Sequence, residues 1–119
     1  MIKIYHYSDI DFSGYIKPDF FGYNSYTQNS GRISRTKRSF FYLDAISREY
    51  YFNGVKFLYI AKVDEKKLYN LDDDVLKLAG QGNIYDKIKK AGYIGVIGNN
   101  GYNSGILFYP TKILEKKVL

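Results

Sequence analysis

The stretch from Val55 to Val63 constrains the fold most, because its apolar residues recur with a period of two. Val55, Phe57, Tyr59, Ala61 and Val63 alternate with other residues, a spacing that places one face of a β-strand against a core. Further short β-rich segments cover residues 1–7, 39–43, 68–71, 93–98 and 104–109. Together they predict a small α+β domain over residues 1–119 with a mostly antiparallel sheet.

Three segments carry helix signals. Residues 45–52 follow Asp44, which can cap a short helix that Asn53 and Gly54 end. The run of three aspartates at 72–74 predicts the start of a helix that continues to residue 78. Residues 84–93 form an amphipathic pattern with Gly92 as the stop signal. By contrast, residues 8–37 have no sustained period, and we expect a long functional loop with short ordered pieces.

Composition excludes several kinds of site. The chain has no cysteine, so disulfides, thiolate catalysis and cysteine metal sites are excluded. Its one histidine, His6, excludes a zinc site built from several histidines. The N-terminal segment reaches acidic residues before any long apolar run, and no stretch has the length of a membrane span. We therefore expect a cytoplasmic protein without a membrane partner.

The charge balance favours an acidic partner. The formal net charge is +6 at pH 7, and Arg32, Arg35 and Arg38 form the densest basic cluster. This cluster predicts binding of a polyanion such as nucleic acid, and an ordinary solvated loop is an equally good interpretation. The 14 tyrosines and 8 phenylalanines supply core, and tyrosine at this density also suits stacking on a ring-bearing ligand.

Three separated pieces of sequence occur in a recognisable order. The first is IYHYS, the second FFYLDAISREYYF, and the third AGYIGVI followed by a turn and YNSGILFYPTKI. In this order the chain resembles the ADP-ribosyltransferase-like superfamily, in its diphtheria-toxin and poly-ADP-ribose-polymerase branch. The resemblance implies a split, mostly antiparallel sheet, NAD as substrate or ligand, and a target that is a protein or a nucleic acid. Small stand-alone members resemble bacterial or phage effectors, including toxins and anti-defence proteins.

The resemblance also implies roles for individual residues. His6 would bind the adenosine ribose of NAD, and Tyr7 stands where the family often has a glycine that holds the nicotinamide amide through its backbone. Phe41 or Tyr42 would form a wall of the nicotinamide pocket. Its remaining side would come from Ser47, Tyr50 or Tyr51. Two of these roles have an alternative interpretation. Ser47 could be an ordinary solvated residue of a helix, and His6 could be a strand-end residue whose side chain bonds the backbone.

The last strand departs from the family pattern. Ser104 occupies the position of the catalytic glutamate, and no carboxylate lies between Ile94 and Leu114. Serine carries no charge, so it cannot stabilise the positive charge that develops on the ribose during transfer. A charge pair about 4 Å apart contributes roughly 4 kcal/mol at an effective dielectric near 20. Its loss would therefore slow the reaction by about a thousandfold. An acid could instead come from Asp9, Asp11, Asp19 or Asp44.

Three functions follow from these patterns. The first is an NAD-dependent ADP-ribosyltransferase, and the second is an inactive member that binds a nucleotide or a protein. The third is a small basic nucleic-acid-binding module. For the first two we expect His6, one of Phe41 and Tyr42, and Ser104 to line a single cleft.

Overall fold

The computed structural model describes residues 1–18, 20–22, 34–44, 55–98 and 103–119. Its strands are β1 (Ile2–Ser8), β2 (Tyr15–Ile16), β3 (Phe20–Gly22), β4 (Ser34–Tyr42), β5 (Phe57–Val63), β6 (Leu68–Asn70), β7 (Gly95–Ile97), β8 (Ser104–Leu107), β9 (Thr111–Lys112) and β10 (Glu115–Val118). A 3₁₀ turn, η3 (Glu65–Lys67), and one α-helix, α1 (Ile84–Lys90), complete the described elements. The α+β class is therefore confirmed.

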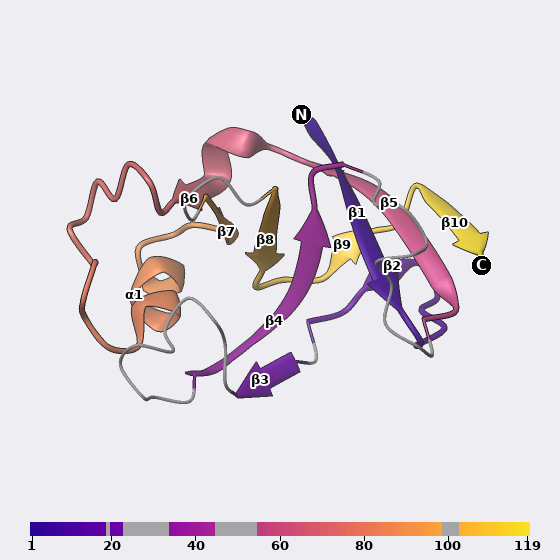
Figure 1. Cartoon of the computed structure of the whole chain (residues 1–119), viewed down its shortest axis with the longest axis horizontal. Helices are drawn as coiled ribbons and strands as arrows, with labels where there is room; N and C mark the ends of the chain where they lie inside the picture. The colour runs from indigo at the N-terminus through magenta and orange to yellow at the C-terminus, as the bar shows by residue number, and fades with distance from the viewer. Residues whose placement is uncertain (19, 23–33, 45–54, 99–102) are drawn as a thin grey trace.

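Seven strands form a continuous path in the order β10-β5-β1-β4-β8-β7-β6, with β3 paired to β4 outside this path (Figure 1). Every pairing between the described strands is antiparallel except that of β6 with β7, which confirms the mostly antiparallel sheet. The strands β1 and β4 are paired at a single position, where Tyr5 lies opposite Tyr42. The sheet therefore consists of two arms that meet at a narrow junction.

The two faces of this sheet bury different clusters. On one, which we call the loop face, Ile4, Tyr59 and Leu107 pack with Phe12 and Ile16 from the segment after β1. A small second sheet of β2 and β9 belongs to this side. The alternation predicted around Tyr59 is confirmed, because Tyr59, Ala61 and Val63 all belong to this cluster.

The opposite side, which we call the helix face, packs against α1. Val96 and Ile106 of the sheet belong to one buried cluster with Tyr85 and Ile88 of the helix. Gly92 adopts φ +100° two residues after the helix ends, a conformation that favours glycine and stops the helix. The predicted helix and its stop signal are confirmed.

The helix predicted from the aspartates at 72–74 is wrong. Residues 71–79 form turns, and Asp74 and Lys77 have positive φ angles of 41° and 57°. The carboxylate of Asp74 accepts hydrogen bonds from the backbone N–H groups of Leu78 at 2.8 Å and Ala79 at 2.9 Å. Such local bonds compete with the bonds of a helix.

The long segment after β1 contains short ordered pieces, as we expected, but its end belongs to a longer strand than the sequence indicated. It contains β2 and β3, and β4 begins at Ser34 rather than at residue 39. The short helix predicted at 45–52 lies outside the described residues. Within the part of the chain that is described, no helix is long and apolar enough to cross a membrane.

Candidate functional site

The three motif-bearing segments come together in the middle of the sheet. The strands β1, β4 and β8 are direct neighbours (Figure 1). Tyr5 pairs with Tyr42, and Tyr42 pairs with Ser104. Because residues paired across antiparallel strands point to the same face, these three side chains form one row on the helix face.

His6 belongs to the opposite face. It follows Tyr5 in a regular strand, and successive side chains of a strand point to opposite sides. Its ring centroid lies 5.9 Å from that of Phe12 and 6.2 Å from that of Tyr59. Its Nδ1 bonds the carbonyl oxygen of Phe40 on β4. The imidazole therefore crosses the gap where β1 and β4 diverge, as the backbone-bonded interpretation predicts.

The expected single cleft is consequently wrong for Ser104 and His6, and this separation counts against the resemblance to the ADP-ribosyltransferase-like superfamily. Tyr5, and not His6, is paired with Tyr42 and so shares a face with Ser104. His6 and Ser104 therefore lie on opposite faces, and the thickness of the sheet separates their side chains. Phe41 lies on the loop face and is buried in the core. Its ring fills the space beside Gly105, where an added Cβ would lie 2.5 Å from the Phe41 Cζ atom.

Three half-buried tyrosines accompany Ser104 on the helix face: Tyr5, Tyr7 and Tyr42, which we call the tyrosine group. The rings of Tyr7 and Tyr42 meet edge to face with centroids 5.9 Å apart, a favourable geometry for aromatic pairs. Sequence reasoning assigned Tyr7 a backbone role and did not single out Tyr5. The period of two in the first strand was the signal that would have grouped their side chains.

Two of the four carboxylates proposed as alternative acids, Asp44 and Asp11, have partners of their own. Asp44 accepts a hydrogen bond at 3.1 Å from Nδ2 of Asn103, the residue that precedes Ser104 in the chain. Asp11 pairs with Lys116, and this hydrogen bond raises the pKa of the Lys116 ammonium. Asp9 is exposed, and Asp19 lies outside the described residues.

The basic cluster does not present all of its charges to solvent. Arg38 is completely buried; its guanidinium donates to the carbonyl oxygen of Thr36 at 2.9 Å and lies over the rings of Phe40 and Tyr85. Burial lowers the pKa of Arg38. The predicted polyanion contact is therefore wrong for Arg38. Of Arg35 the structure describes only the backbone, in β4.

Several predicted site residues lie outside the described residues, namely Arg32, Ser47, Tyr50 and Tyr51. Among the residues that are described, no group of three or more histidine, aspartate or glutamate side chains could hold a metal ion. Comparison of the chain with protein-family models, curated proteins and solved structures gives no match.

Proposed function

We propose that this chain binds NAD, or a related adenine nucleotide, as an ADP-ribosyltransferase-like domain that transfers ADP-ribose slowly or not at all. The proposal is supported most by the row that joins Tyr5, Tyr42 and Ser104. These residues come from the three sequence pieces that carry the resemblance, and they are far apart in the chain. The narrow junction between the two arms agrees with the split sheet that the resemblance implies.

The tyrosine group offers a surface for a ring-bearing ligand. Tyr7 and Tyr42 are half-buried, so their rings are held in place while part of each stays open to solvent. Aromatic rings stack on bases without regard to sequence, at about 1–3 kcal/mol per base. The hydroxyl of Ser104, in the same row as Tyr42, adds a polar group that can bond a ribose hydroxyl.

Slow transfer follows from the charges at this row. Cleavage of the bond to nicotinamide develops positive charge on the ribose, and Ser104 cannot stabilise it as a carboxylate would. Asp44 is bonded to Asn103 beside the row. The imidazole of His6 lies on the opposite face and bonds Phe40. We therefore propose binding of the nucleotide without efficient turnover.

Calorimetric titration of the whole chain with NAD tests binding, and Tyr42→Ala is the informative variant. We expect wild type to bind and Tyr42→Ala to lose roughly tenfold or more in affinity, the equivalent of one stacked ring. Tyr15→Ala is the matched control, because Tyr15 is 50% exposed on β2 and should bind as wild type does. Absence of binding in wild type would contradict the proposal.

NAD hydrolysis tests the second part of the proposal. We expect little turnover by wild type and a measurable gain in Ser104→Glu, with about a thousandfold as the ceiling set by the Coulomb estimate. Misplacement of the new carboxylate would reduce this gain. Robust hydrolysis by wild type would show that the acid comes from elsewhere in the chain.

A further inference from the structure

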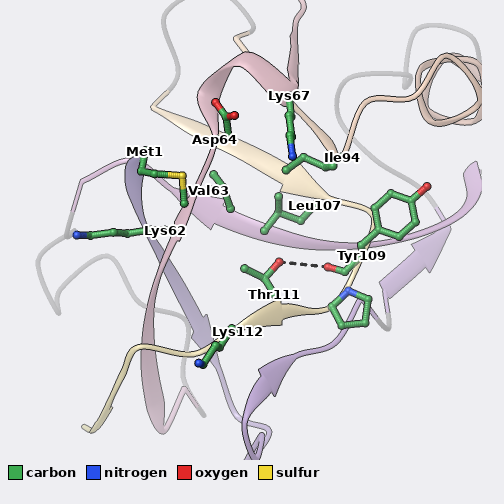
Figure 2. Close-up of a pocket in the computed structure, with 11 residues that line it drawn as sticks. Met1, Lys62, Val63, Asp64, Lys67, Ile94, Leu107, Tyr109, Thr111 and Lys112 are labelled. Carbon is green, nitrogen blue, oxygen red and sulfur yellow. Dashed lines mark hydrogen bonds between the residues drawn. The ribbon is translucent and has the colours of Figure 1, made fainter.

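A pocket of about 390 Å³ lies on the loop face, away from the tyrosine group. It is bounded by the end of β5, by η3 and by the segment between β8 and β9 (Figure 2). Val63 and Leu107, which belong to the buried cluster of the loop face, form its floor. Pockets that hold small molecules have volumes of about 300–1,000 Å³, so this one has room for a small ligand.

Three lysines line the pocket around this apolar floor. Lys67 directs its ammonium toward Ile94, whereas the side chains of Lys62 and Lys112 extend away from the floor at the rim (Figure 2). Within the described residues, the ion pairs of lysines involve Lys90, Lys116 and Lys117 and none of these three.

The acidic residue of the pocket has a local role. The Asp64 carboxylate accepts a hydrogen bond from the backbone N–H of Lys66 at 3.1 Å, which caps η3. Three lysines against one aspartate leave a local charge of +2. The pocket therefore favours an anion, and a compact lysine ammonium is a common partner of phosphate.

Tyr109 supplies an aromatic wall (Figure 2). Its side chain is 44% exposed. The ammonium of Lys89 lies 5.1 Å from its ring centroid, and Thr111 donates a hydrogen bond to its carbonyl oxygen at 3.2 Å. Both contacts help to hold the tyrosine, and an exposed ring beside a basic rim suits a ligand that combines a phosphate with a ring.

We propose that this pocket binds a small phosphate monoester that carries a ring, such as a nucleoside monophosphate. Lys67, whose ammonium lies beside Ile94, binds the phosphate; Lys112 adds positive charge at the rim, and Tyr109 stacks on the ring. The site is independent of the tyrosine group, because its floor lies on the opposite face of the sheet. The proposal therefore stands without the NAD-binding function.

The test is calorimetric titration of the whole chain with AMP, with adenosine and inorganic phosphate as the two partial probes. We expect AMP to bind more tightly than adenosine or phosphate alone, and added salt to weaken its binding. The double variant Lys67→Gln, Lys112→Gln should lose roughly tenfold in AMP affinity. Tyr109→Ala should weaken AMP binding and leave phosphate binding unchanged.

Lys66→Gln is the matched control, since it removes one positive charge from the same 3₁₀ turn at a residue that does not line the pocket. It should bind AMP as wild type does. Equal losses of AMP affinity in Lys66→Gln and the double variant would overturn the proposal, because they would show a general effect of charge rather than binding in the pocket. Loss of AMP binding in Tyr42→Ala but not in the lysine variants would assign the ligand to the tyrosine group instead. Preference for a single-stranded oligonucleotide over AMP would overturn the small-molecule class.

Discussion

Two buried tyrosines, Tyr59 and Tyr69, hold loops against different arms of the sheet, and they do so with different chemistry. Tyr59 on β5 donates a hydrogen bond to the carbonyl oxygen of Ile10 at 2.7 Å and accepts one from the backbone N–H of Phe12 at 2.7 Å. Both hydrogen bonds that fix the segment after β1 therefore join neutral groups. Its ring also lies 5.9 Å from the ammonium of Lys116.

Tyr69 on β6 uses a charged partner. Its hydroxyl donates to the carboxylate of Asp74 and accepts from the backbone N–H of Leu76 at 3.0 Å. Burial, and next the bond to Asp74, raises the pKa of Tyr69. The same bond, followed by the one from Leu78, lowers the pKa of Asp74.

The two anchors thus differ in what should release them. The hydrogen bonds of Tyr59 join neutral groups, whereas those of Tyr69 depend on the charge of Asp74. The Asp11–Lys116 ion pair beside the first anchor is partly exposed and contributes little.

The largest expected effect is at the neutral anchor. Tyr59→Phe keeps the ring but removes the hydroxyl, which leaves the buried N–H of Phe12 without that acceptor. An unsatisfied buried group costs about 1–3 kcal/mol, so the free energy of unfolding should fall by that amount in urea titration. Tyr15→Phe, at an exposed position on β2, is the control. An unchanged midpoint in Tyr59→Phe would remove this anchor from the comparison.

The second effect separates the anchors by pH. The lowered pKa of folded Asp74 means that its stabilising contribution is present above the unfolded value, near 3.9, and is lost as pH falls through the folded pKa. On acidification below about pH 4 we expect the amides of Leu78 and Ala79 to lose protection from hydrogen exchange before that of Phe12. Two-dimensional NMR measures both in one sample.

Asp74→Asn is the matched control for that experiment, since it keeps the shape of the side chain and removes the titrating charge. The amides of Leu78 and Ala79 should then show little response to acid. If both loops opened together in wild type, the charged anchor would have no separate effect on stability.

The smallest expected effect concerns Tyr5 and Tyr42 of the tyrosine group, which are half-buried. Tyr5→Phe and Tyr42→Phe should change the free energy of unfolding by less than about 0.5 kcal/mol, the usual range for partly exposed positions. The same variants keep the rings that stack on a ligand, so NAD affinity should change little. A loss as large as that in Tyr59→Phe would show that these hydroxyls are structural.

Local patterns were sufficient for the elements whose signals lie within a few residues. The period of two around Tyr59 identified β5, and the amphipathic pattern that stops at Gly92 identified α1. The sheet-rich α+β class follows from such signals, because alternation and helix stops depend on neighbours in the chain. The aspartates at 72–74 had an equally local helix signal. The carboxylate of Asp74 instead accepts hydrogen bonds from Tyr69 and from the backbone N–H groups of residues 78 and 79, and these bonds hold a turn.

The arrangement of the candidate site was decided by contacts between distant segments. Alternation requires that His6 and Tyr7 point to opposite faces, but only the pairing of Tyr5 with Tyr42 decides which of them shares a face with Ser104. A shift of one residue in this register would exchange the two. Arg38 is buried with its guanidinium over the ring of Tyr85 of α1, a residue far from it in the chain. The lysine pocket likewise joins residues from β5, η3 and the segment after β8. No spacing in the chain encodes their meeting, because packing between distant segments brings them together.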